Sequence, residues 1–382
     1  MKIIIAPDSF KGSLSAAEVC DIMEKAILTV LPLTEIIKIP ISDGGEGLVN
    51  TLLNLEDGRK IIVPVKDPLF RKTNAAYGIL NGKTAVIEMA AASGLTLLTN
   101  EERNPMLTTT FGTGELIIDA IKNQGCDTVI LGIGGSATND GGMGVATALG
   151  VKFYDKNHDV LSPCGQSLEK IVSIDTAHID PIIFQKDIII ACDVDNPLFG
   201  TQGAAQVYGP QKGASEEMTI SLDKGLKHLG ILLEKVSGKE LIDLPGLGAA
   251  GGMALPLVAL FDAQLKSGLE IVLDRINFNE LIQGADLIIT GEGKTDKQST
   301  RGKVISGVGK RGEDQKIPVI VISGALEKGY EVLFDQGITA AFATYNNSKN
   351  LEWHMDHAKE ELEATVINLF RSLAALDGKT NS

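Results

Sequence analysis

A glycine-rich segment at residues 132–144 carries the densest polar chemistry of the sequence. Six of its thirteen residues are glycine, and four of the others have short polar side chains. Backbone of this kind exposes N–H groups and lets a ligand approach closely, which suits phosphate and other anions. A plain turn between a strand and a helix needs far fewer glycines, so a ligand site is the better interpretation. The residues expected to bind phosphate or substrate hydroxyls here are Gly134, Gly135, Ser136, Thr138 and Asn139.

Three further loops, each at the expected end of a strand, carry pairs of carboxylates: Asp43 and Glu46, Asp193 and Asp195, and Glu292 and Asp296. Magnesium-assisted phosphoryl transfer uses carboxylates to hold the cation and a base to take the proton of the acceptor hydroxyl. We expect Asp43 or Asp193 to orient or deprotonate that hydroxyl. Asp195 and Asp296 are the metal candidates, and Glu292 is a binding candidate. A single aspartate beside glycine is more often a turn or cap residue, but several such loops together favour a site.

Lys11 is a cation in a loop that leads from a short strand into a helix. The helix start is marked by Ser15 and Glu18, which have the spacing of a capping box. Because anions are favoured at a helix N-terminus, we expect an anionic group of the substrate near Lys11 and Ser13. The alternative is a solvated loop lysine, but its position beside Gly12 favours a function.

Two familiar nucleotide-binding motifs match only in part. Gly132, Gly134 and Ala137 fit the dinucleotide fingerprint, with Asp155 at about the expected distance of ~20 residues, which keeps a dehydrogenase as an alternative. The glycines continue beyond the motif, however, into the region where the helix should already run. The segment 291–295 ends like a phosphate-binding P-loop but has Ile288 in place of the motif's first glycine. It is therefore not a P-loop.

The two ends of the chain show the alternation of a parallel α/β sheet. Apolar runs at 3–6 and 35–41 are each followed by a glycine loop and the pattern of an amphipathic helix. After residue 278 the alternation returns, with strands expected at 286–290, 318–323 and 338–344 and a closing helix at 351–373. His354 and His357 on that helix are expected to be exposed.

The middle of the chain follows another pattern. Three short strands are expected at 60–65, 73–80 and 84–89, and the Asn81-Gly82 pair predicts a hairpin between the last two. A helix capped by Thr113, buried strands at 127–131 and 188–191, and a helix at 216–236 follow. We therefore expect an α/β protein of two domains: a flavodoxin- or Rossmann-like parallel-sheet domain from residues 1–58 and 280–382, and an inserted mixed-sheet domain from 59–279.

Composition excludes several classes of partner. The net charge of −14 and an aromatic content of 4% argue against a nucleic-acid-binding face. No apolar run has the length of a membrane span, and a membrane partner is not expected. The cysteines Cys20, Cys126, Cys164 and Cys192 are widely spaced, which indicates small buried side chains in a reducing cytoplasm and no disulfide or zinc framework.

Taken together, the motifs resemble those of the bacterial type I glycerate kinase family. The segments that carry the resemblance are 6–14, 43–47, 132–142, 191–198, 209–214, 248–252 and 289–293, which span nearly the whole chain in consistent order. Small departures are Ser42 and Leu48, which stand where alanine and threonine are expected.

The resemblance implies ATP-dependent, Mg²⁺-assisted phosphorylation of D-glycerate in a cleft between two α/β domains, one of them flavodoxin-like and built from both termini. The usual product of the family is 2-phosphoglycerate, and 3-phosphoglycerate is also compatible with the sequence. In this interpretation the carboxylate of glycerate lies near Lys11 and Ser13. A sensor that binds a phosphorylated metabolite through the same loops is the non-enzymatic alternative. A homo-oligomer is compatible with the sequence.

Overall fold

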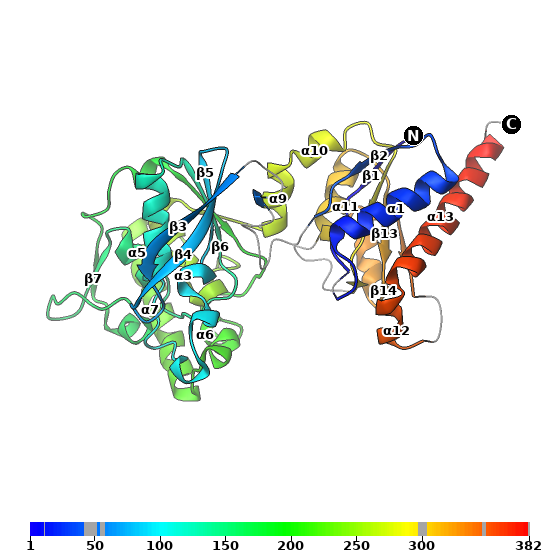
Figure 1. Cartoon of the computed structure of the whole chain (residues 1–382). Helices are drawn as coiled ribbons and strands as arrows, with labels where there is room; N and C mark the ends of the chain where they lie inside the picture. Colours follow the sequence, from blue (N-terminus) through cyan, green and yellow to red (C-terminus); the bar gives the residue numbers. More distant parts are fainter. Residues whose placement is uncertain (11, 42–51, 54–57, 297–303, 346–348, 381–382) are drawn as a thin grey trace. The chain divides into compact units, whose positions relative to one another are not determined.

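Residues from both ends of the chain form the first of two units in the computed structural model (Figure 1). This unit comprises Met1–Asp43 and Leu269–Ser382, and the second unit comprises Gly44–Gly268. The structure describes residues 1–10, 12–41, 52–53, 58–296, 304–345 and 349–380. Both units are α/β, as the sequence predicts.

The first unit contains a five-stranded, fully parallel sheet. Its strands are β1 (Lys2–Ile5), β2 (Glu35–Lys38), β11 (Leu287–Thr290), β13 (Val319–Ser323) and β15 (Ala340–Ala343). In space they follow the order β2-β1-β11-β13-β15, which in chain order reads 2-1-3-4-5, the flavodoxin-like arrangement. A parallel sheet covered on both faces needs continuous apolar strands, and all three isoleucines of β1 are fully buried. The predicted flavodoxin-like sheet is confirmed.

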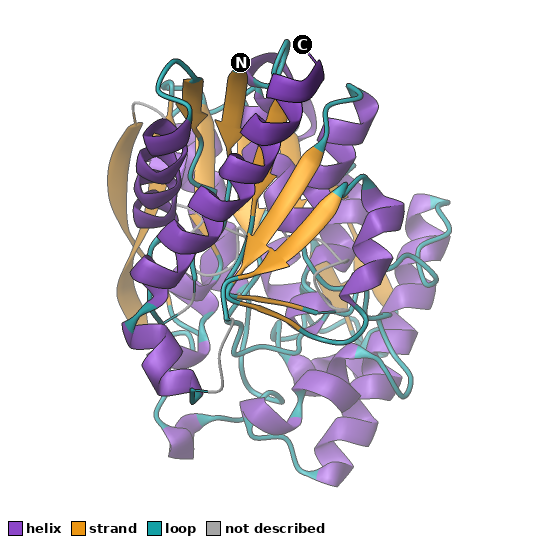
Figure 2. Cartoon of the chain, turned by 90° about the vertical axis from the view of Figure 1, so that its right-hand side faces the viewer, coloured by secondary structure: helices purple, strands orange, loops and turns teal. Residues whose placement is uncertain are grey.

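Helices cover both faces of this sheet (Figure 2). On one face α1 (Ala16–Val30) packs beside α13 (Ala358–Thr380), and both share an apolar cluster with Ile5 and Ile289 of the strands. On the other face α11 (Val304–Asp314) packs with Gly312 against Ile288 and Val319. Successive strand residues thus serve opposite faces. The remaining elements of this part of the chain are α9 (Gly268–Arg275), α10 (Phe278–Leu281), α12 (Leu351–Asp356), β12 (Lys294–Thr295) and β14 (Ala325–Leu326).

The second unit is built on a six-stranded mixed sheet with the order β10-β9-β6-β5-β4-β3. Its strands are β3 (Gly58–Lys66), β4 (Lys72–Leu80), β5 (Thr84–Glu88), β6 (Thr128–Gly132), β9 (Asp187–Ala191) and β10 (Gln264–Lys266). The first three pair in antiparallel fashion, whereas β5, β6, β9 and β10 run parallel. Asn81 and Gly82 have φ of 48° and 66°, the positive values that a tight hairpin turn requires, and the predicted hairpin is confirmed.

Helices and short elements complete the second unit. The helices are α3 (Ala90–Ser93), α4 (Phe111–Ile118), α5 (Met143–Ala148), α6 (Ala204–Tyr208), α7 (Glu216–Ser237) and α8 (Ala254–Phe261). A small antiparallel ribbon pairs β7 (Lys152–Tyr154) with β8 (Ser173–Asp175). Leucines of α7 that recur at helical spacing (Leu222, Leu226, Leu229 and Leu233) are fully buried in the core of this unit.

Three predicted helix features differ in the structure. The closing helix is divided, since α12 ends at Asp356 and α13 begins at Ala358. His354, expected to be exposed, is only 3% exposed, and its Nδ1 lies 2.8 Å from Glu361 Oε2. Thr113 does not cap α4, because the helix begins at Phe111 and Thr113 lies inside it. The α1 capping box of Ser15 and Glu18 is confirmed.

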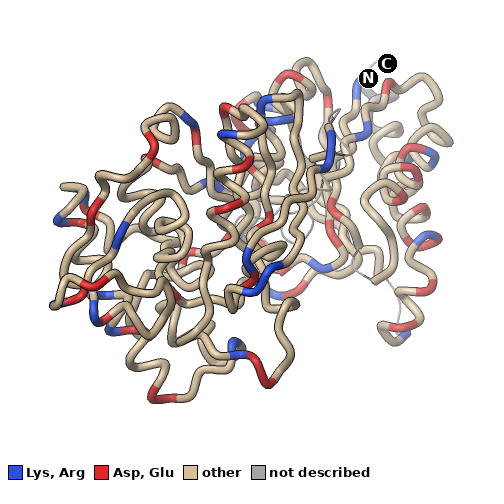
Figure 3. The backbone as a smooth tube through the Cα atoms, turned by 60° about the vertical axis from the view of Figure 1, so that its left-hand side comes forward, with Lys and Arg blue, Asp and Glu red and all other residues tan. Residues whose placement is uncertain are grey.

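Charged residues are interspersed along the chain (Figure 3). Acidic and basic positions alternate over short distances in both units, in keeping with a chain whose negative charge is spread over many segments. Among the described helices, none combines the length and the apolar content that crossing a membrane would require.

Candidate active site

A cavity of about 620 Å³ lies in the second unit at the carboxyl ends of three parallel strands. Glu88 ends β5, Gly132 ends β6 and Ala191 ends β9, and all three line the cavity. In α/β sheets ligands bind outside the carboxyl ends of parallel strands, because the loops there diverge and leave space. The sheet itself therefore places this cavity where a ligand site is expected.

The first half of the glycine-rich segment forms one wall of the cavity. Gly134, Gly135 and Ser136 all line it. A Cβ added at Gly134 would meet no other atom, so the backbone there borders open space. Gly135 has a φ of 68°, a conformation that favours glycine, and its carbonyl accepts a 2.9 Å hydrogen bond from Leu95 N. This half of the segment is held in place while its backbone still faces the cavity.

The second half of the segment is anchored by Asp140, which is fully buried. Its Oδ2 accepts hydrogen bonds from the backbone N–H and the hydroxyl of Thr110, both at 2.8 Å, and from Gly144 N at 3.0 Å. Its Oδ1 accepts a hydrogen bond from Gly142 N at 3.1 Å. Burial raises the pKa of Asp140 above its ordinary value, although these hydrogen bonds act in the opposite direction. Asp140 thus joins the segment to the start of α4.

Lys212 is a site residue that the sequence analysis does not single out. It is 1% exposed, it lines the cavity, and its Nζ donates hydrogen bonds to Ser136 Oγ at 2.7 Å and to the carbonyl oxygen of Thr138 at 2.6 Å. Burial lowers the pKa of Lys212 to about 7, with the negative charge of Asp140 acting in the opposite direction. The signal in the sequence is a lysine between Pro210-Gln211 and Gly213 in an acidic chain.

Thr138 and Asn139 lie deeper than Ser136. Both are fully buried and neither lines the cavity. Among the described residues, Thr138 Oγ1 and both amide atoms of Asn139 have no hydrogen-bond partner. Buried polar groups without a partner are costly, so this pocket of polar atoms suits a bound water or a ligand group. The binding roles of these two residues stay predictions.

Asp193 reaches the cavity from the loop that follows β9. It lines the cavity, its side chain is exposed, and its Oδ1 accepts a 2.8 Å hydrogen bond from Gly268 N. Asp195 is exposed two residues further on and does not line the cavity. Asp193 is therefore placed to meet a ligand, whereas Asp195 lies outside the lining of the cavity.

The first unit presents its own polar residues at the ends of β1 and β11. Asp8, which follows β1, is 8% exposed, and its N–H donates to Gly291 O at 2.8 Å. The neighbouring Glu292 is half-buried. In a sheet of order 2-1-3-4-5 the gap between these two strand ends is the topological switch point, where ligands bind. Asp8 is a second residue that the sequence analysis does not single out.

The other predicted residues of the first unit have mixed outcomes. Ser13 is half-buried, and its hydroxyl donates to Phe10 O at 3.0 Å in a local turn. Asp296 is half-buried beyond β12. Lys11, Asp43 and Glu46 lie outside the described residues, so their roles stay predictions.

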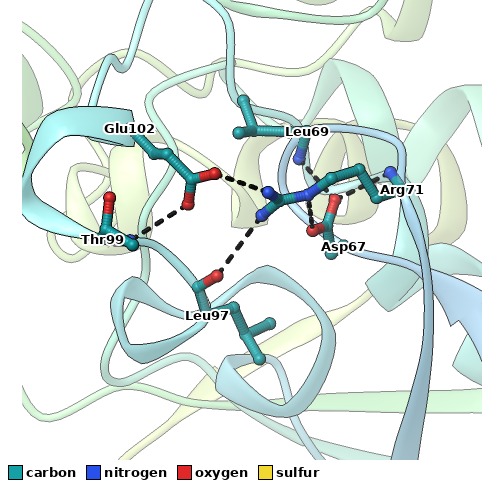
Figure 4. A network of polar contacts seen from close by, with 6 residues as sticks. All are labelled: Asp67, Leu69, Arg71, Leu97, Thr99 and Glu102. Carbon is teal, nitrogen blue, oxygen red and sulfur yellow. Dashed lines mark hydrogen bonds and ion pairs between the residues drawn. The ribbon is translucent and has the colours of Figure 1, made fainter.

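A polar network fixes the loop that closes one side of the cavity (Figure 4). Arg71 Nε donates to Asp67 Oδ2 and its Nη1 donates to Glu102 Oε1, both at 2.6 Å. The buried Asp67 also accepts the backbone N–H groups of Leu69 and Arg71 at 2.8 Å. The network ties the β3–β4 turn to residues 95–102, and Leu95 of that loop lines the cavity.

Magnesium fits the available residues in one way. Among the described residues there is no group of three or more His, Cys, Asp or Glu side chains that could hold a metal ion. Mg²⁺ is commonly held by one or two carboxylates together with substrate phosphates and waters. An exposed aspartate such as Asp195 meets that requirement, and a dedicated protein cage is not needed.

Both partial nucleotide motifs are explained by the structure. The dinucleotide fingerprint needs a helix that opens within the motif, but α5 begins only at Met143, eleven residues after the end of β6 at Gly132. The segment 291–295 ends in the short strand β12 (Lys294–Thr295), whereas a P-loop leads directly into a helix. The glycine-rich segment at 132–144 therefore lacks the early helix start of a dinucleotide-binding turn.

Comparison with known proteins gives a consistent result. A model of the glycerate kinase family matches residues 3–374. The "Glycerate kinase" of Bacillus cereus (strain ATCC 10987 / NRS 248) is 46% identical over 370 residues, 97% of each chain. The "Glycerate 2-kinase" of Escherichia coli (strain K12) is 44% identical over 375 residues, 98% of each chain.

A solved structure agrees with these sequence comparisons. A crystal structure from Salmonella typhimurium LT2, which carries the provisional name glycerate kinase 2, is similar with a TM-score of 0.83 and 41% identity. The similarity covers 99% of both chains. These matches extend over nearly the whole chain, through the strand-end loops and the cavity described above. The chain therefore belongs to the glycerate kinase family, and it is a kinase.

Proposed function

We propose that the enzyme transfers the γ-phosphoryl group of ATP to the 2-hydroxyl of D-glycerate, with Mg²⁺, and forms 2-phosphoglycerate. The name of the Escherichia coli relative, "Glycerate 2-kinase", supports this choice of product. The single structural observation that carries the proposal is the cavity at the ends of β5, β6 and β9, which combines glycine backbone, a buried lysine and a carboxylate. The glycine backbone and the lysine suit anionic substrates, and the carboxylate suits a hydroxyl that must lose its proton.

Catalysis of phosphoryl transfer consists largely of positioning and of stabilising charge. The backbone at Gly134 and Gly135 and the hydroxyl of Ser136 would hold oxygens of phosphate or substrate. Asp193 would orient the glycerate hydroxyl and accept its proton as the new P–O bond forms and the bond to ADP breaks. Asp195 and Asp296 would hold Mg²⁺, which when bound neutralises phosphate charge.

The remaining assignments concern the first unit. Lys11 and Ser13 would bind the carboxylate of glycerate, Glu292 would contact substrate or phosphate, and Asp43 is the alternative base. The expected placement of the site in a cleft between two domains stays a prediction. All four cysteines are unpaired, and we infer a reducing, cytoplasmic environment.

The direct test is release of ADP in the presence of D-glycerate, ATP and Mg²⁺, followed by phosphorus NMR of the product. We expect the 2-phosphate, and a 3-phosphate signal would contradict the proposed product. Asp193→Asn should lower kcat by about 10²–10⁴-fold, the usual contribution of a general base. Asp159→Asn, a change of an exposed aspartate away from the cavity, is the matched control.

A further inference from the structure

We propose that Lys212 and Ser136 together form an anion-binding subsite in the cavity of the second unit, in which both donate hydrogen bonds to one oxyanion group. The group is a phosphate or a carboxylate. The inference rests on the proposed function, because that reaction uses substrates that carry both kinds of group.

The hydrogen bonds of Lys212 leave one donor for a ligand. A lysine ammonium has three N–H donors and no acceptor. Two of them are used at Ser136 Oγ and at the carbonyl oxygen of Thr138. Both partners are uncharged acceptors, so they orient the ammonium without neutralising it. Because Lys212 lines the cavity, its third N–H donor is left for a ligand there.

Ser136 is prepared in the same way. Its oxygen accepts the hydrogen bond of Lys212, which leaves its own O–H to donate elsewhere. Ser136 also lines the cavity, next to the open backbone at Gly134. The ammonium and the serine hydroxyl therefore each keep one donor at this end of the cavity, beside the open glycine backbone.

A purely structural role for Lys212 does not account for its surroundings. Lysine is almost never fully buried unless it is paired with an opposite charge. Lys212 is 1% exposed, yet among the described residues it makes no ion pair. Asp140 acts on it only as a nearby charge and has its own four hydrogen bonds. An anion in the cavity would supply the missing counter-charge.

The charge of Lys212 should respond to such an anion. Burial lowers the pKa of Lys212 to about 7 in the ligand-free protein. The other titratable groups that face the cavity are Glu88, Asp193, Cys192 and Tyr208, with Asp140 behind the glycine-rich segment. A bound oxyanion favours the ammonium form and raises this pKa, so the anion should bind together with a proton.

The test is isothermal titration calorimetry of the whole protein with ADP and, separately, with D-glycerate. The titrations are repeated at about pH 8 in buffers of different ionisation enthalpy, which measures proton uptake. We expect uptake of close to one proton with the ligand that occupies the subsite, and an affinity that falls roughly tenfold per pH unit above pH 7. Uptake with ADP identifies a phosphate as the occupant, and uptake with D-glycerate identifies the carboxylate.

Three variants separate this role from a structural one. Lys212→Met should abolish the proton uptake and weaken that ligand by more than tenfold. Ser136→Ala should weaken the ligand while the proton uptake remains. Lys156→Met, a change of an exposed lysine outside the cavity, should leave both unchanged. Far-UV circular dichroism shows whether each variant is folded.

Certain results would overturn the proposal. These are unchanged affinity of folded Lys212→Met for both ligands, proton uptake that persists in that variant, or no binding of either ligand by the folded wild-type protein. Failure of the proposed function looks different. A protein that binds one anion with a Lys212-dependent proton but releases no ADP would keep the subsite and refute the reaction.

Discussion

Replacing Lys212 by methionine should change the pH dependence of folding stability in a defined direction. The ordinary pKa of the side chain is 10.5, and burial lowers it to about 7 in the folded protein. Between these two values the unfolded chain binds a proton that the folded chain does not. Stability therefore rises with pH in this window, because the slope follows the excess of protons bound by the unfolded state.

The magnitude follows from the two pKa values. Where the unfolded chain binds one proton more than the folded chain, the free energy of unfolding rises by about 1.4 kcal/mol per pH unit. Integrated from pH 7 to pH 9, this rise amounts to about 2 kcal/mol. At pH 7 the loss of folding stability caused by burying Lys212 is close to its maximum. We therefore expect Lys212→Met to be at least as stable as the wild type at pH 7, although it loses two hydrogen bonds.

The assay is urea unfolding of both proteins at pH 7, 8 and 9 without ligand. The advantage of Lys212→Met should shrink by about 2 kcal/mol over this range. Asp140 contributes with the opposite sign, since a raised carboxyl pKa makes stability fall as the pH rises through it. Comparing the two proteins removes most of that contribution. A difference that is independent of pH would refute the reasoning, because it would mean that Lys212 keeps an ordinary pKa in the folded protein.

Substitutions at three other positions, Asp140, Gly142 and Arg71, test the scaffold of the cavity. Asp140→Ala leaves buried N–H groups without an acceptor and should lower the free energy of unfolding in urea by about 3–6 kcal/mol. Asp140→Asn should cost less, because it keeps one acceptor oxygen. Equal losses in the two variants would show that the oxygens of Asp140 do not matter. Gly142→Ala should be several kcal/mol less stable than Gly238→Ala. Both glycines have a φ of 72°, but only a Cβ at Gly142 collides with another residue, at Met253 O. Similar melting temperatures of the two variants would contradict this. Arg71→Ala should cost about 1–3 kcal/mol of stability, because it leaves the buried carboxylate of Asp67 without its cation. It should also raise KM by loosening the loop at 95–102, and an unchanged KM would separate that loop from ligand binding.

Much of the fold could be predicted because local pattern and tertiary packing agree. The apolar runs of β1, β11 and β13 are buried in a parallel sheet, and the Asn81-Gly82 pair forms the hairpin that its backbone preferences favour. Where local signals compete with distant partners, prediction fails. A hydroxyl near the start of α4 could cap the helix, but the one at Thr110 bonds to Asp140, thirty residues away, and Thr113 lies within the helix.

The candidate site was predictable only in part for the same reason. The glycine-rich segment and Asp193 could be predicted from composition and from their position directly after strands. Lys212 does not, because its burial depends on contacts with Ser136 and Thr138, more than seventy residues earlier. His354 is similar: its spacing on an amphipathic helix suggests exposure, but Glu361 and the ring of Tyr345 enclose it.

The strand order of the first unit has a consequence for how the chain is synthesised. β1 emerges first from the ribosome, but its partner β11 begins only at Leu287, and the hydrogen bond from Lys2 N to Asp286 Oδ2 spans 284 residues of sequence. At a translation rate of about 5–20 residues per second, β1 and β2 wait tens of seconds with an open, isoleucine-rich edge. The second unit is continuous in the chain and lies between these partners, so it can fold during that interval. Nascent chains that stop before residue 287 would expose an aggregation-prone strand pair.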